Sequence, residues 1–145
     1  MQDSIFTKII KGEIPCHKVY EDEHTLAFLD IEPLAPGHTL VVPKVQVDQV
    51  DELPAEDYQA LMATVQKVSR HLRTTLGTKR CVIQVLGFDV PHAHIHIIPA
   101  DSGMQFFEEI VNHVDSVKTD KAYPYKPNGE ELADMAKRIY LGDAA

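Results

Sequence analysis

The sequence predicts an α+β fold in which a five-stranded antiparallel sheet packs with one long and one or two short helices. Several short apolar segments separated by turn residues indicate strands, and residues 54–76 show a long helical period. A histidine-rich segment near residue 95 alternates polar and apolar positions, as a further strand does. We therefore expect a single domain over residues 1–145, with a C-terminal extension from about residue 100.

The first elements follow from caps and turn residues. A short amphipathic helix is expected after Ser4, a possible cap, and before Gly12. Two strands of a hairpin follow at about 18–21 and 25–29, separated by acidic turn residues. A third strand, at about 39–42, comes after a turn-rich stretch.

The long helix is expected over residues 54–76, with Gly77 as its C-terminal stop. A fourth strand at about 81–85 precedes the histidine strand, which is the fifth. Residues 105–114 fit either a helix or a loop anchored by phenylalanines, and residues 121–129 form a turn-rich link. A last helical pattern runs over residues 129–141.

Charge and cysteine content limit the possible partners and compartment. The net charge of −8 disfavours nucleic acid and anionic membranes as partners, because both would be repelled by most of the surface. Cys16 and Cys81 are the only cysteines, and no leader-like or long apolar segment is visible, so we expect a cytoplasmic protein. A bound phosphate must then be met locally, by a few imidazoles and backbone amides.

Three histidines at two-residue spacing are the main functional signal. His92, His94 and His96 should share one face of a strand, and the apolar residues between and after them should pack on the other, namely Ala93, Ile95, Ile97 and Ile98. Each positive charge disfavours protonation of the next ring, so at least one imidazole should be neutral at pH 7. A neutral imidazole can act as a base, a metal ligand or a nucleophile.

A metal centre made directly by the three histidines is the less favoured alternative. Three successive residues on one strand face span about 14 Å at their Cα atoms, too far for one ion unless the strand bends. We therefore expect neither a metal nor a cofactor.

The motif HAHIHII, from His92 to Ile98, resembles the signature of the histidine triad family of nucleotidyl hydrolases and transferases. The segments SIFTKIIKGEIP and AFLDIEPLAPGHTLVVPK resemble the family's first helix and ribose-binding strand, in the same order. The resemblance implies that His94 attacks the α-phosphorus of a nucleotide, with its other ring nitrogen held by a backbone carbonyl. It implies that His96 and His92 flank the phosphate and that His38 joins them from a neighbouring strand.

The same resemblance implies a binding site for a purine nucleotide. Asp30 matches the acidic residue that takes the two ribose hydroxyls. The apolar base pocket would comprise Ile5, Phe6, Ile9, Phe28 and Ile31, with Leu29 beside them. Family members usually form homodimers through the long helix and the fourth strand, so a homodimer is expected.

The implied activity is release of a purine nucleoside 5'-monophosphate from an amine or phosphate leaving group. The adenosine phosphoramidase-like bacterial branch is the nearest match, and a dinucleoside polyphosphate hydrolase is the alternative. A nucleotide-binding or interaction module with little turnover is a second alternative.

Two departures from the family pattern bear on these expectations. Many bacterial relatives bind a structural zinc through two cysteines and a histidine where this chain has Ser4, Thr7 and Gln46, which argues against zinc here. Relatives also carry a longer glycine-rich loop before the triad, whereas this chain has LGFDVP. Phe88 and Asp89 stand where contacts to the phosphate and leaving group are expected, so substrate preference is expected to depend on them.

Overall fold

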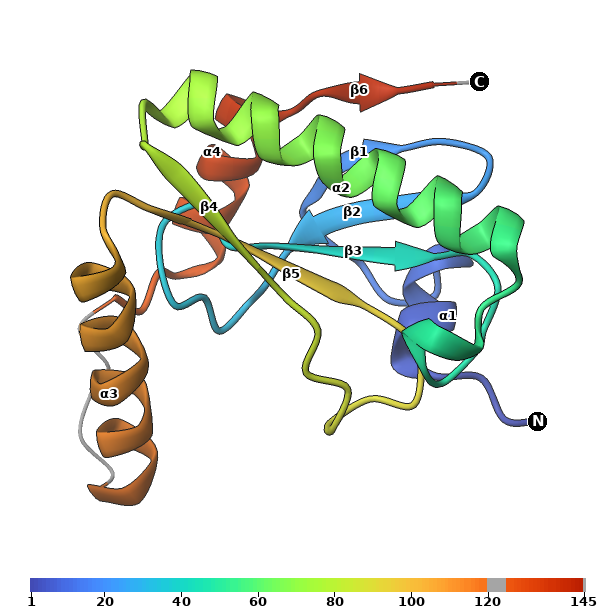
Figure 1. The fold of residues 1–145 in the computed structure, drawn as a ribbon, viewed down its shortest axis with the longest axis horizontal. Helices are drawn as coiled ribbons and strands as arrows, with labels where there is room; N and C mark the ends of the chain where they lie inside the picture. The colour runs from blue at the N-terminus through green and yellow to red at the C-terminus, as the bar shows by residue number, and fades with distance from the viewer. Residues whose placement is uncertain (120–124, 145) are drawn as a thin grey trace.

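A computed structural model describes residues 1–119 and 125–144. These residues form an α+β fold around one six-stranded sheet, in the order β4-β5-β3-β2-β1-β6 (Figure 1). The strands are β1 (Lys18–Glu21), β2 (Thr25–Leu29), β3 (Thr39–Pro43), β4 (Arg80–Gln84), β5 (Ile95–Ala100) and β6 (Gly142–Asp143). The expected fold class is confirmed, and so are the bounds of the hairpin.

The helices in the described residues are α1 (Ile5–Ile10), α2 (Ala55–Leu76), α3 (Gly103–Thr119) and α4 (Gly129–Ile139), and a 3-10 turn, η1, covers Val50–Glu52. Ser4 caps α1, since its hydroxyl oxygen accepts the N–H of Thr7 at 3.0 Å. Gly77 ends α2 in the left-handed conformation that a side chain disfavours. Both ends are where the sequence places them.

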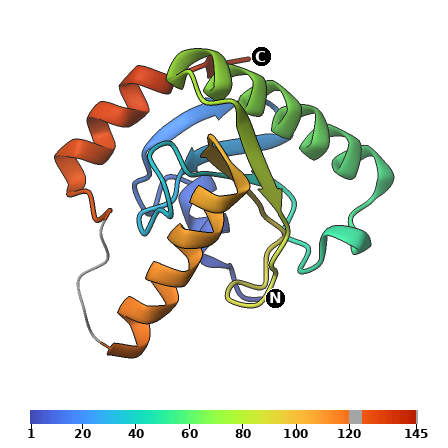
Figure 2. The same ribbon diagram turned by 60° about the vertical axis from the view of Figure 1, so that its left-hand side comes forward.

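The main core lies between the sheet and the pair α2 and α4. Alternate residues of the central strands point to this side, and they meet the apolar stripe of α2. Figure 2 shows α2 and α4 together above the sheet, with α1 beneath it. The fully buried residues of this main core include Val19, Val41, Leu61, Val65, Val68, Leu72, Ile95, Ile97 and Ile139.

The opposite face of the sheet carries a smaller apolar cluster under α1. Phe6 packs there with Leu26, Phe28, Leu40 and Val42. Strand register places this cluster beside the histidines, because Leu40 pairs with Phe28 on one side and with His96 on the other. The site therefore lies on the α1 face, separated from the main core by the sheet.

The structure corrects three expectations and decides one alternative that the sequence left open. Residues 103–119 form the helix α3, which projects from the body in Figure 1, and β6 adds a short strand parallel to β1. Strand β5 begins only at Ile95, so His92 and His94 precede it. Ile98 lies on the same side as His96, where it packs with Phe106 of α3. Residues 121–124 of the predicted link lie outside the described residues.

Candidate active site

The three histidines gather on the α1 face although only one belongs to a strand. The rings of His94 and His96 are 5.2 Å apart, and the ring of Phe6 is 5.0 Å from His94. The backbone N–H of Ala93 donates to the carbonyl of Val47 at 2.7 Å, which fixes the segment leading into β5. The segment is thus held in place even before the strand begins.

The ring of His94 has a defined tautomer. Its Nδ1 lies 2.8 Å from the backbone carbonyl of His92. A carbonyl oxygen can only accept a hydrogen bond, so Nδ1 must carry the proton. A neutral His94 therefore has its lone pair on Nε2, which is the arrangement a nitrogen nucleophile needs.

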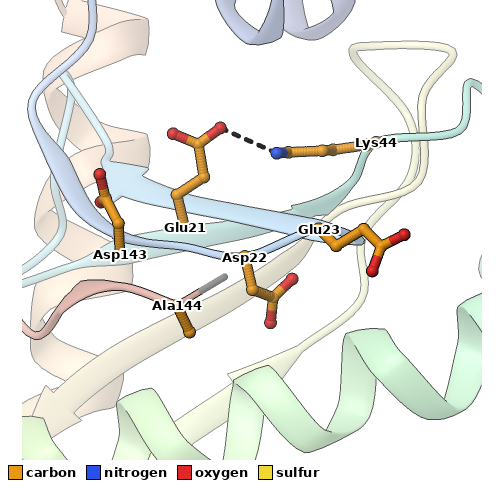
Figure 3. Close-up of a pocket in the computed structure, with 6 residues that line it drawn as sticks. All are labelled: Glu21, Asp22, Glu23, Lys44, Asp143 and Ala144. Carbon is orange, nitrogen blue, oxygen red and sulfur yellow. Dashed lines mark ion pairs between the residues drawn. The ribbon is translucent and has the colours of Figure 1, made fainter.

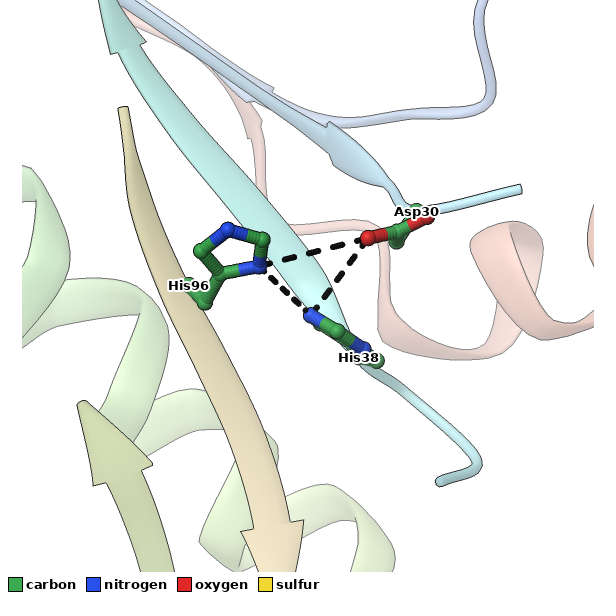
Figure 4. A group of neighbouring side chains, drawn as sticks. All are labelled: Asp30, His38 and His96. Atoms are coloured by element: carbon green, nitrogen blue, oxygen red, sulfur yellow. Dashed lines mark hydrogen bonds and ion pairs between the residues drawn. The ribbon is translucent and has the colours of Figure 1, made fainter. Parts of the chain in front are cut away.

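The ring of His96 has the opposite arrangement. The backbone N–H of Leu34 donates to Nδ1 of His38 at 3.0 Å, so a neutral His38 carries its proton on Nε2. That Nε2 lies 3.0 Å from Nδ1 of His96, which must therefore accept (Figure 4). The remaining proton of His96 is on Nε2, so His96 offers a donor where His94 offers a lone pair.

Asp30 completes this group of side chains. Its Oδ2 lies 3.5 Å from Nε2 of His38 and 4.0 Å from Nδ1 of His96, and its Oδ1 accepts the backbone N–H of Glu32 at 2.9 Å. The carboxylate places a negative charge beside the imidazoles of His38 and His96. A positive charge that develops on them during a reaction is stabilised by that charge.

Asp30, His38 and His96 are also close enough to share a metal ion, since one ligand atom of each lies within 4.8 Å of the others. The proton on Nε2 of His38 argues against metal binding by this group. A neutral His38 that accepts from Leu34 has no lone pair on Nε2, the atom that faces the group. Hydrogen bonding therefore accounts for the cluster better than metal ligation does.

Burial favours the neutral forms of His92 and His96. Desolvation, followed by the charge on His94, lowers the pKa of His96 to about 4, although Asp89 opposes the shift. Desolvation also lowers the pKa of His92, against the hydrogen bond to the Pro43 carbonyl. Neutrality was expected from mutual repulsion, and burial is the larger cause.

The structure revises the role expected of His92. Its side chain is fully buried, and both ring nitrogens are engaged: Nε2 with the Pro43 carbonyl at 2.8 Å, and Nδ1 with the Ser4 hydroxyl at 2.7 Å. No ring nitrogen is left to contact a phosphate. His92 acts instead through its carbonyl, which holds His94.

The expected base pocket is only partly assembled. Phe6, Phe28 and Ile9 share the cluster beside His94, and the rings of Phe6 and Phe28 are 5.7 Å apart. Leu29 was wrongly included, because strand alternation turns it into the main core on the other face. Ile5 and Ile31 are outside the cluster and are 49% and 72% exposed.

Comparisons with known proteins agree with this geometry. Residues 11–103 match the family model of the HIT domain. This chain belongs to the HIT, or histidine triad, family. It is 40% identical over 144 residues to the Bacillus subtilis protein named hit, covering 95% of this chain and 92% of that protein.

Two further HIT relatives bear on function and fold. An adenosine 5'-monophosphoramidase of Schizosaccharomyces pombe is 38% identical over 100 residues, covering 66% of this chain and 72% of that enzyme. The crystal structure of a Hit-like protein from Bartonella henselae superposes with a TM-score of 0.76 at 29% identity, covering 95% of both chains.

The loop that departs from the family pattern lies beside the triad of this HIT domain. The backbone N–H of His92 donates to the carbonyl of Val90 at 2.8 Å, which ties the end of the loop to the triad. Phe88 is 91% exposed, and Asp89 is exposed as well. The carboxylate of Asp89 is nevertheless close enough to His96 to act on its pKa.

A separate surface pocket of about 370 Å³ lies away from the histidines, beside the end of β1. Figure 3 shows Glu21 paired with Lys44 there, with Asp22, Glu23 and Asp143 around them. Four carboxylates against one ammonium group disfavour a phosphate at this place. Among the described residues, no helix has the length and apolar character needed to cross a membrane.

The predicted residues His38, His94, His96 and Asp30 are brought together, as are Phe6, Ile9 and Phe28. Sequence reasoning did not foresee that Ser4, Thr7 and Gln46 contact one another, or that Ser4 and Thr7 contact His92. The available signal was that all three differ together from the zinc ligands of bacterial relatives.

Proposed function

We propose that this HIT protein is a nucleotide hydrolase in which Nε2 of His94 attacks the α-phosphorus of a purine nucleoside 5'-phosphate. The observation that carries the proposal is the opposite protonation of two neighbouring rings. The His92 carbonyl leaves a lone pair on Nε2 of His94, and the Leu34–His38 chain leaves a proton on Nε2 of His96. A nucleophile and a donor thus stand on neighbouring rings whose centroids are 5.2 Å apart.

The reaction would proceed in two displacements. The nitrogen of His94 forms a bond to phosphorus while the bond to the leaving group breaks, and the electron pair goes to the leaving nitrogen or oxygen. A bound phosphate favours protonation of His96, which then transfers its Nε2 proton to that atom. Water next attacks the phosphorus and gives a proton to Nε2 of His96, and the N–P bond breaks to release the nucleotide and neutral His94.

An amine is the preferred leaving group in this proposal, and a second phosphate is the alternative. Support comes from the Schizosaccharomyces pombe relative, which is named an adenosine 5'-monophosphoramidase. The cluster of Phe6, Ile9 and Phe28 would pack against the purine base. Asp30, whose side chain is 19% exposed, would accept the ribose hydroxyls.

The test compares wild type, His94→Ala and a control, His24→Ala, whose ring lies in the β1–β2 turn. Each is incubated with adenosine 5'-phosphoramidate and with a dinucleoside polyphosphate. We expect kcat of His94→Ala to fall at least about a thousandfold, because the covalent route is lost, while the control keeps wild-type turnover. A wild type that cleaves neither substrate, or no faster than His94→Ala, contradicts the proposal.

A nucleotide-binding module with little turnover is the second candidate, and the exposed Phe88 in the short loop favours it. Calorimetry with AMP distinguishes the two. Tight AMP binding without hydrolysis of either substrate supports the binding module, and absence of AMP binding excludes it.

We also propose a homodimer that uses α2 and the free edge of β4. A groove of about 400 Å³ there is lined by both elements, including Met62, Arg73, Cys81 and Ile83. Ile83 is 49% exposed on a strand that, within the described residues, has a neighbour on one side only. An edge strand presents unpaired backbone groups that can pair with another chain. A cytoplasmic location stays a prediction from the sequence.

A further inference from the structure

Four side chains from three separate segments meet at the start of α1. The Ser4 hydroxyl lies 2.7 Å from Nδ1 of His92, and the Thr7 hydroxyl lies 3.4 Å from the same atom. Gln46, which follows β3, accepts the Thr7 hydroxyl at 2.5 Å and the Ser4 backbone N–H at 2.8 Å through its side-chain oxygen. Ser4 and His92 are both buried.

The protons in this cluster have one consistent arrangement. The Pro43 carbonyl accepts from Nε2 of His92, so Nδ1 of a neutral His92 must accept. Ser4 then donates its single hydroxyl proton to Nδ1, and its oxygen accepts the N–H of Thr7 at 3.0 Å. Thr7 donates to Gln46, whose amide nitrogen donates to the carbonyl of Gln2 at 2.9 Å.

The cluster continues directly to the nucleophile. His92 is held at both ring nitrogens, and its carbonyl accepts Nδ1–H of His94 at 2.8 Å. The Ser4 hydroxyl therefore both caps α1 and orients the residue that sets the tautomer of His94. Phe6, on the same helix, packs its ring 5.8 Å from His92 and 5.0 Å from His94.

We propose that Ser4, Thr7 and Gln46 form a metal-free positioning network that orients His92 and, through its carbonyl, the attacking nitrogen of His94. Two hydroxyls and an amide are neutral and hydrogen-bond one another fully, whereas zinc sites in proteins use thiolate, imidazole and carboxylate ligands. The inference rests on the function proposed above for His94, and it assigns to these three residues an effect on kcat rather than on nucleotide binding.

Two Ser4 variants separate positioning from helix capping. Ser4→Ala removes both the cap and the donor to His92. Ser4→Asp keeps a good cap, but a carboxylate cannot donate to Nδ1 and instead favours a protonated His92. Ser4→Thr keeps both functions and serves as the conservative rescue. Lys11→Ala is the control, because Lys11 ends α1 and pairs at the surface with Asp3.

The readouts are the imidazole 15N chemical shifts, kcat, KM and the melting temperature. In the wild type we expect a neutral Nε2–H ring for His92 and a neutral Nδ1–H ring for His94. In Ser4→Ala and Ser4→Asp we expect altered His92 shifts, a kcat lower by about tenfold to a hundredfold, and an unchanged KM. Ser4→Thr and Lys11→Ala should keep the wild-type shifts and kcat.

Two results overturn the proposal. One is a Ser4→Asp protein with wild-type imidazole shifts and kcat. The other is a Ser4→Ala protein whose melting temperature falls while kcat, measured well below that temperature, is unchanged, because Ser4 then acts only as a cap. The shifts need no substrate, so a wild type without turnover but with the expected tautomers contradicts the proposed function and not the network.

Discussion

At the scale of single residues, two neighbouring imidazoles of the same chemical type are given different tasks by their partners. His94 donates through Nδ1 to a carbonyl, and His96 accepts through Nδ1 from His38. Nε2 therefore carries a lone pair in His94 and a proton in His96. One backbone carbonyl and one backbone N–H, those of His92 and Leu34, are enough to create this difference.

The lowered pKa of His96 predicts a loss of stability in acid. A folded pKa of about 4, against 6.5 in the unfolded chain, means that the unfolded state binds more protons between these values. The contribution is complete above pH 6.5 and is lost as the pH falls toward 4. It is on the order of 3 kcal/mol.

Urea unfolding of the wild type and of His96→Asn across pH 4–7 measures this contribution. The variant should show a shallower decline of the free energy of unfolding between pH 6.5 and 4, since Asn does not titrate. Parallel curves for the two proteins would show that His96 is already solvated in the folded state.

At the scale of elements, the connection between β2 and β3 brings Asp30 and His38 to the triad. Gly37 lies in this connection with φ +87°, a conformation that side chains rarely adopt. A Cβ on Gly37 would lie 3.3 Å from Cγ of Pro99 in β5 and 2.6 Å from Cδ1 of Leu76 at the end of α2. The glycine thus lets the loop approach both elements.

Gly37→Ala should therefore reduce the free energy of unfolding by about 2 kcal/mol, through backbone strain and crowding together. Gly12→Ala is a matched control, because Gly12 has φ +80° but its Cβ would meet no atom within 4 Å. Strain alone should cost about 1 kcal/mol there. Equal losses in chemical denaturation would show that the contacts with Pro99 and Leu76 adapt freely.

At the scale of the whole molecule, the sheet has one edge covered by a short segment and one edge left open. The two residues of β6 pair with β1 at one edge, whereas β4 has only β5 as a neighbour in the part of the chain that the structure describes. α3 carries a second set of exposed apolar side chains, namely Met104, Phe107 and Val111. The β4 edge and α3 are thus competing candidates for a dimer surface.

Light scattering after size exclusion decides between them. We expect the wild type at twice the monomer mass of 16.3 kDa, and Ile83→Asp at the monomer mass, because a buried unpaired charge opposes the contact. Val111→Asp should stay dimeric. A dimer that is lost only in Val111→Asp would place the interface on α3, and a monomeric wild type would contradict the proposed dimer.

The amino-acid pattern predicted most of the elements, and the resemblance of HAHIHII to the histidine triad signature supplied the chemistry expected of the candidate site. Short-range signals suffice for the elements: Ser4 and Gly77 mark helix ends, and turn residues bound the apolar runs of β2 and β3. The two-residue spacing of His94 and His96 marks an unusual face. Residues 105–114 fitted both a helix and a loop, because their apolar pattern carries no signal for what Phe106 packs against.

The tertiary structure decided which face Leu29 occupies and which nitrogen of each histidine holds a proton. It also changed His92 from an expected phosphate ligand into a support for His94. The physical reason is that a hydrogen bond depends on distance in space, and the partners concerned are far apart in the chain. Ser4 and His92 are separated by 88 positions, and His38 and His96 by 58, so no local pattern records either contact.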